Sequence, residues 1–118
     1  MYDRITEVNL LYDFYAMLLT DKQREAIRLY HCENLSLSEI SDEFSISRQG
    51  VYDALKNAEK ALEEYECKLG LLRKFEYTSK LLDNAGKHID MLINENIGNK
   101  ELTDKLAYLK KVINDLNK

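Results

Sequence analysis

A short polar run between positions 47 and 56 has the residue types that read a nucleic acid, provided that it lies on one helix face. Arginine can donate two hydrogen bonds to guanine, and glutamine can bond adenine through both ends of its amide. A serine ahead of the helix and the open amides of the first turn can hold a phosphate. The candidate DNA-binding residues are Ser47, Arg48, Gln49, Tyr52, Asp53 and Lys56.

Four of these candidates have a second interpretation. Asp53 would lie close to a DNA groove, where it could accept a hydrogen bond from a cytosine amino group or simply repel the DNA. Tyr52 is equally suited to packing and to stacking. Arg48 and Gln49 would be only a solvated first turn if the helix binds no nucleic acid.

The residues around this run have the pattern of two helices joined by a sharp turn. Ser41 is the small residue where the two backbones approach, and the residues between Phe44 and Ser47 supply the turn. In such a helix-turn-helix the second helix lies in the major groove with its first residues against the base edges. Apolar residues stand where the helices would cross, at Ile40, Phe44, Ile46, Val51 and Ala54.

Hydrophobic spacing predicts four helices in residues 1–70. Thr20 with Gln23, and Ser36 with Glu39, form capping boxes that open two of them. Ser47 is expected to cap the fourth helix, which meets no breaker before Gly70 and so runs for about six turns. The expected helices span about residues 6–19, 20–32, 36–44 and 47–69.

Residues 71–118 have two apolar stripes separated by Ile97-Gly98-Asn99, which predicts a helical hairpin or coiled-coil packing. The second stripe is either an intramolecular core or a dimer seam, and we favour a homodimer because helix-turn-helix readers commonly span two half-sites. The expected domains are 1–70, a helix-turn-helix domain with an N-terminal helix, and 71–118, a hairpin for dimerisation or extension. The stripes are Phe75, Leu82, Ala85, Ile89 and Leu92, then Leu102, Leu106, Leu109, Ile113 and Leu116.

Composition excludes several classes of protein. Apolar residues make up 45% of the chain and charged residues 32%, typical of a globular protein. No apolar run suits a signal peptide or a membrane span, so we expect a cytoplasmic protein without a membrane partner. Isolated His31 and His88, two cysteines without ligand spacing, and the lack of a phosphate loop or nucleophile motif argue against a metal, a cofactor and an enzyme.

Charge opposes a nucleic-acid partner. Residues 20–69 contain seven lysines and arginines against eleven aspartates and glutamates. Affinity for DNA comes largely from neutralising phosphates, so an acidic unit should bind DNA weakly unless its cations gather on one face. We expect Arg48 and Lys56 to gather at the reading face, while Glu59, Glu63, Glu64 and Glu66 lie further along the helix.

Three blocks resemble region 4 of bacterial sigma factors: Leu19–Arg24, Leu35–Ser41 and Ile46–Tyr52. The chain resembles the YlxM family of helix-turn-helix proteins more closely, from Leu11–Tyr15 through Ser47 to Tyr65. This resemblance implies an all-α dimer and a regulatory link to the signal recognition particle pathway. Ser45 stands where many such turns carry glycine, and Gly50 stands where this family usually has alanine.

The expected fold is therefore all-α: a sigma region 4-like trihelical helix-turn-helix unit, a long fourth helix and a C-terminal helical hairpin. Two functions remain open. The first is a DNA-binding regulator of transcription. The alternative is a protein-interaction module that uses the helix-turn-helix as scaffold for a basic partner, such as signal recognition particle protein or RNA polymerase.

Overall fold

The structure is a computed structural model that describes residues 3–117, and it confirms the expected all-α class. Two short segments, η1 (a 3-10 helix, Ala16–Leu18) and η2 (a π-helix, Arg28–Cys32), follow the first two α-helices. The described chain divides into two compact units, Met1–Leu72 and Arg73–Lys118. The α-helices are α1 (Arg4–Tyr15), α2 (Asp21–Ile27), α3 (Leu37–Phe44), α4 (Arg48–Leu69), α5 (Leu71–Glu95) and α6 (Lys100–Leu116).

Helix starts follow the capping residues of the sequence. Both expected capping boxes form, with the Thr20 and Ser36 hydroxyls accepting from the backbone N–H three residues on. Ser47 caps α4 by accepting from Gly50 N at 3.0 Å. At the other end of α4, Gly70 adopts a left-handed conformation with φ 64°, which ends the helix where expected.

The first two expected helices reach about as far as their hydrophobic spacing indicates, but each changes type before it ends. In the expected helix over residues 6–19, the α-helical part ends at Tyr15 and η1 continues to Leu18. The expected helix over residues 20–32 widens into the π-helix η2 after Ile27. Glu33 N donates to Arg28 O, five residues back, and not to Leu29 O, the acceptor that an α-helix would use. A left-handed Asn34 (φ 59°) then turns the chain toward α3.

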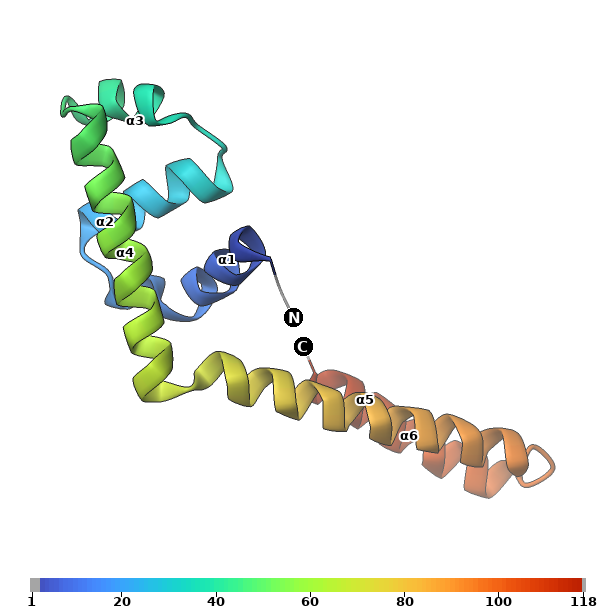
Figure 1. Ribbon diagram of the computed structural model, residues 1–118. Helices are drawn as coiled ribbons and strands as arrows, with labels where there is room; N and C mark the ends of the chain where they lie inside the picture. The colour runs from blue at the N-terminus through green and yellow to red at the C-terminus, as the bar shows by residue number, and fades with distance from the viewer. Residues whose placement is uncertain (1–2, 118) are drawn as a thin grey trace. The chain divides into compact units, whose positions relative to one another are not determined.

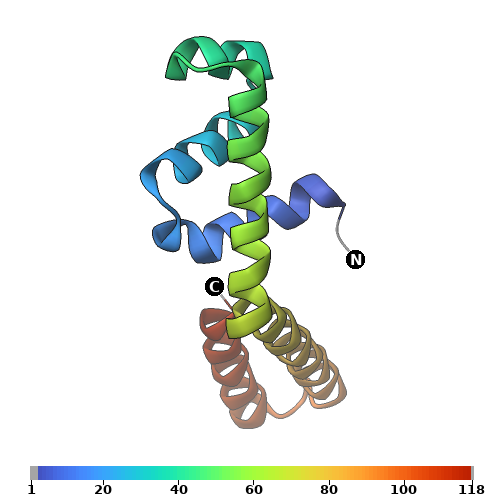
Figure 2. The ribbon, with the colours of Figure 1, turned by 60° about the vertical axis from the view of Figure 1, so that its left-hand side comes forward.

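In the first unit, α4 is the element against which α1, α2 and α3 pack, as Figures 1 and 2 both show. Each helix contributes fully or almost fully buried side chains to one core. Burial of a large aliphatic or aromatic side chain contributes about 1.5 to 3 kcal/mol, so this core holds the helix-turn-helix in place. The core residues include Val8, Leu11, Tyr15, Ala26, Ile27, Ile40, Val51, Leu55, Ala58 and Leu62.

The second unit is the expected helical hairpin, with α5 and α6 side by side and antiparallel (Figures 1 and 2). Its turn, residues 96–99, includes the expected break at Ile97-Gly98-Asn99. Ile89 and Leu106 are buried in the seam. Lys110 also pairs with Asp90 across the seam.

The apolar stripes of the hairpin are only partly buried in this seam. Phe75 and Leu92 remain 46% and 45% exposed on α5, and Leu109 and Leu116 remain 49% and 67% exposed on α6. The seam side of α6 is more polar than the stripe expected from spacing. It carries Thr103, Leu106, Lys110 and Ile113, and the C-cap residue Asn117 follows on the same side.

Within the described residues, no helix has both the length and the apolar character needed to cross a membrane.

Candidate nucleic-acid interface

The turn between α3 and α4 is held by local hydrogen bonds. Ser45 adopts the left-handed conformation, φ 55° and ψ 41°, that lets the chain reverse after Phe44. The Ser41 hydroxyl donates to Ile46 O at 2.5 Å, and Ile46 N donates back to Ser41 O at 3.2 Å. Ser41 thus ties the turn to α3 in addition to being small, a role that its size alone does not reveal.

The structure places all six candidate residues within α4's N-cap and its first two and a half turns, with their side chains accessible. Ser47, Arg48, Gln49, Asp53 and Lys56 are exposed, and Tyr52 is 46% exposed. Val51 and Leu55 on the same helix are buried, so the candidates occupy the outward face. The arrangement is the one that a helix needs to present side chains to a groove.

Two pairs of candidate side chains contact each other along this face. Gln49 Nε2 donates to Asp53 Oδ1 at 3.0 Å, and Lys56 Nζ lies 5.4 Å from the centre of the Tyr52 ring. Arg48, Tyr52 and Lys56 therefore form one row along the helix, spaced by four residues. Gln49 and Asp53 form a second, neighbouring row.

The helix N-terminus keeps open donors beside these rows. The oxygen of the Ser47 hydroxyl accepts from Gly50 N, so the N–H groups of Arg48 and Gln49 remain as first-turn donors for an anion. Gly50 keeps this cap compact, since a Cβ there would lie 3.2 Å from Ser47 Oγ and 3.4 Å from Ile46 Cδ1. An alanine at position 50 would require the Ser47 or Ile46 side chain to shift by a few tenths of an ångström.

Ion pairing leaves the cations of this face unneutralised. Three other arginines of the first unit are paired: Arg4 with Glu7, Glu59 and Glu63, Arg24 with Asp21, and Arg28 with Glu25 and Glu33. Within residues 3–72, Arg48 and Lys56 take part in no ion pair. Although the unit is acidic as a whole, two positive charges without an ion pair stand at the outward face of α4.

A buried polar cluster lies apart from this face. The Glu59 carboxylate, 8% exposed, contacts His31 Nε2 at 3.1 Å and Arg4 at 3.1 Å. His31, which has no partner at metal-ligand spacing in the sequence, is thus brought by packing to a carboxylate 28 positions away. Burial by itself would raise the pKa of Glu59, but the hydrogen bonds with His31 and Arg4 outweigh it and lower the pKa below 4.5.

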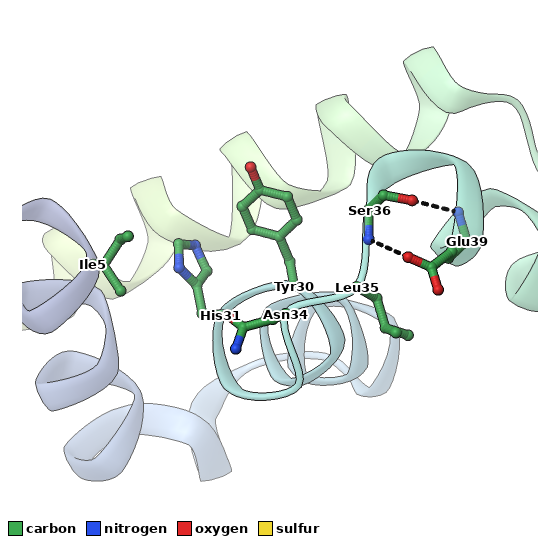
Figure 3. Close-up of a pocket in the computed structure, with 7 residues that line it drawn as sticks. All are labelled: Ile5, Tyr30, His31, Asn34, Leu35, Ser36 and Glu39. Carbon is green, nitrogen blue, oxygen red and sulfur yellow. Dashed lines mark hydrogen bonds between the residues drawn. The ribbon is translucent and has the colours of Figure 1, made fainter.

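A hollow of about 340 Å³ lies next to this cluster, between α1, η2 and the start of α3 (Figure 3). Ser36 and Glu39, on its α3 side, bond each other reciprocally, so these groups are already satisfied. No group of three or more metal-binding side chains occurs among residues 3–117. The hollow is lined by Ile5, Tyr30, His31, Asn34, Leu35, Ser36 and Glu39.

Comparison with known proteins agrees with this architecture. The family model "Putative helix-turn-helix protein, YlxM / p13 like" matches residues 2–116. The UPF0122 protein of Listeria innocua is 40% identical over 112 residues, which are 95% of this chain and 99% of the relative. That of Halalkalibacterium halodurans is 49% identical over 90 residues, 76% of this chain and 83% of the relative, and that of Thermoanaerobacter sp. is 44% identical over 117 residues, 99% of each. With its two capped helices, its sharp turn and these relatives, the chain belongs to the UPF0122 family of helix-turn-helix proteins.

Proposed function

We propose that this protein is a DNA-binding regulator of transcription that reads duplex DNA through the first turns of α4. The observation that carries the proposal is the state of Arg48, which is exposed, free of any ion pair within residues 3–72, and placed at the start of the second helix of the motif. A guanidinium in that position can bond guanine bidentately. Lys56, two turns on, is the second cation of the same row and would contact a phosphate.

We further propose that the protein acts as a homodimer through its hairpin. Two helices bury only one seam, and the apolar residues outside it remain about half exposed, including Phe75, Leu81, Leu92 and Leu109. Surface of this kind favours a second pair of helices, which would complete a four-helix bundle. A dimer would also present two α4 helices to two half-sites.

We further propose that the protein acts in the cytoplasm and that its regulation is linked to the signal recognition particle pathway. The resemblance to the YlxM family supports this link.

A second candidate function is favoured by the excess of acid in the first unit. Exposed carboxylates on α3 and α4, such as Asp42, Glu43 and Glu64, would suit a basic partner such as signal recognition particle protein or RNA polymerase. Glu59 takes no part in such a surface because it is buried and paired. Charge reversal at Asp42, Glu43 and Glu64 would abolish capture of that partner, and unchanged capture would exclude this mode of binding.

The experiment for the first candidate is a fluorescence-anisotropy titration of labelled genomic DNA fragments at low and at physiological salt. We expect saturable binding that Arg48→Ala abolishes while helicity by circular dichroism stays unchanged. The matched control is Lys68→Ala, which removes an exposed cation from the other end of α4 and should leave binding intact. Equal binding by folded Arg48→Ala and wild type would overturn the proposal.

A further inference from the structure

Gln49 and Asp53 are one turn apart on the outward face of α4 and are joined by the hydrogen bond from Gln49 Nε2 to Asp53 Oδ1, 3.0 Å long. Glutamine and aspartate four residues apart stabilise each other in helices through such a bond. The bond also distinguishes the two ends of the amide, because only the nitrogen end can donate to a carboxylate. It therefore fixes which way the Gln49 amide faces.

The amide keeps enough capacity to read a base while it is held in this way. A glutamine amide has two N–H donors and one carbonyl acceptor. Bidentate recognition of adenine uses one N–H, toward N7, and the carbonyl, toward the N6 amino group. Asp53 needs only the remaining N–H, so Gln49 can satisfy Asp53 and adenine at the same time.

Although the hydrogen bond of Asp53 favours base recognition by Gln49, its negative charge lowers the affinity for DNA. Its carboxylate is exposed on the same face as Arg48 and Lys56 and would lie near the DNA phosphates. A negative charge there weakens the attraction to the backbone, which contributes strongly to affinity regardless of base sequence. A residue that only contributed to affinity would therefore not be an aspartate.

We propose that Asp53 is a positioning residue for base recognition, which orients Gln49 toward an adenine and lowers the protein's affinity for DNA as a whole. The proposal rests on the DNA-binding function proposed above. Asp53 does not itself touch the base. Its contribution is to restrict the Gln49 amide to the orientation that pairs with adenine.

The hydrogen bond and the charge can be separated with two substitutions at position 53. Asp53→Asn removes the charge but keeps a side-chain oxygen that accepts from Gln49 Nε2, whereas Asp53→Ala removes both. Gln49→Ala identifies the base position that Gln49 reads. All variants change exposed residues, and circular dichroism and thermal melting check that each full-length protein is folded.

The measurement starts with a pool of random-sequence duplex DNA, selected on the full-length wild-type protein and sequenced. Affinities are then compared for duplexes that differ only at the base pair whose preference Gln49→Ala loses. For wild type we expect adenine to be favoured there by about fivefold or more over the other bases. A double-mutant cycle between positions 49 and 53 tests whether the two residues act as a unit.

The two variants should diverge in specificity but not in affinity. Both should bind DNA about twofold or more tighter than wild type, because each removes one negative charge near the phosphates. Asp53→Asn should keep the adenine preference, and Asp53→Ala should lose at least half of it. In the Gln49→Ala background, where the preference is already lost, adding Asp53→Ala should cause no further change in preference. If Asp53 had a purely structural role, the two variants would not differ in adenine preference while sharing the same gain in affinity.

The failures are distinguishable. If Asp53→Ala binds DNA with the same adenine preference as wild type, or if Asp53→Asn loses that preference as fully as Asp53→Ala, the positioning role is wrong and the DNA-binding function stands. If wild type binds no DNA even at low salt, both proposals fail together.

Discussion

Tyr15, fully buried in α1, donates a hydrogen bond from its hydroxyl to Glu66 Oε1 at 2.6 Å, near the end of α4. The same two side chains accept from the first turn of α5: Leu71 N donates to the Tyr15 hydroxyl, and Leu72 N donates to Glu66 Oε1, both at 3.0 Å. Burial and then the hydrogen bond to Glu66 raise the pKa of Tyr15 above 10. The pair thus caps a helix whose preceding residue, Gly70, has no side chain to do so.

Removing the Tyr15 hydroxyl tests this cap. We expect Tyr15→Phe to lower the free energy of unfolding by about 1 to 3 kcal/mol, because it removes the acceptor of the Leu71 N–H and one hydrogen bond to the charged Glu66, which keeps its bond from Leu72 N. Urea unfolding followed by circular dichroism measures the change. The matched control is Tyr65→Phe. The Tyr65 hydroxyl donates to the exposed Leu18 O, so water can take the place of the hydroxyl, and its removal should cost less than about 1 kcal/mol. Equal losses in the two variants would contradict the proposed cap.

Local parts of the fold were predictable because the interacting groups are close in sequence. The capping boxes at Thr20 and Ser36 join residues three apart, and Ser47 caps α4 by accepting from Gly50 N. The starts of α2, α3 and α4 could therefore be predicted from the sequence. The outward face of α4 followed in the same way, from helical spacing around buried Val51 and Leu55.

Contacts between distant residues could not be predicted. His31 and Glu59 are 28 positions apart, and Tyr15 and Glu66 are 51 apart. In sequence, Glu59 is indistinguishable from its exposed neighbours Glu63 and Glu64, since only packing decides which carboxylate is buried. In the hairpin, spacing showed that α6 has apolar residues but not which side faces α5, because that side also carries Lys110.

A glycine at the turn of the helix-turn-helix should stabilise the protein. Ser45 is held at φ 55°, a left-handed conformation that costs a residue with a side chain about 1 to 2 kcal/mol. We expect Ser45→Gly to raise the free energy of unfolding by about 0.5 to 1 kcal/mol, part of the gain being offset by the greater freedom of glycine in the unfolded chain. Differential scanning calorimetry would show a higher Tm.

The control for this substitution is Lys60→Gly, at an exposed position within α4, where a glycine should lower stability by about 0.7 kcal/mol. Opposite signs for the two glycine variants would attribute the effect at Ser45 to its backbone conformation. A loss of stability in Ser45→Gly would refute this account.

The buried carboxylate of Glu59 should matter far more than its exposed neighbour. Glu59→Gln removes the charge that His31 and Arg4 bond, and we expect a loss of about 2 kcal/mol, the range for hydrogen bonds to charged groups. Glu63→Gln is the control. Glu63 also pairs with Arg4, but its side chain is 47% exposed, so its loss should cost less than about 1 kcal/mol.

The Glu59 effect should depend on pH in a defined direction. Because the pKa of Glu59 is lowered in the folded protein, its ionised form contributes stability above about pH 4.5, and this contribution is lost as the pH falls through the folded-state pKa. The stability difference between wild type and Glu59→Gln should therefore be largest near neutral pH and shrink below about pH 4.5. A difference that grew on acidification would show that the carboxylate is not stabilised by its partners.

The proposed dimer can be tested at Leu109, which is 49% exposed on α6. A charge there would be buried without a partner in a four-helix bundle, which costs several kcal/mol, so Leu109→Glu should shift the protein to monomer. Multi-angle light scattering measures the mass. Lys111→Glu, an exposed position on the same helix, should leave the dimer intact. DNA affinity should fall in parallel with dimer loss, because two linked reading helices bind more tightly than one. A wild-type protein that is monomeric at all concentrations would exclude the dimer, and the half-exposed apolar residues of the hairpin would then need another partner.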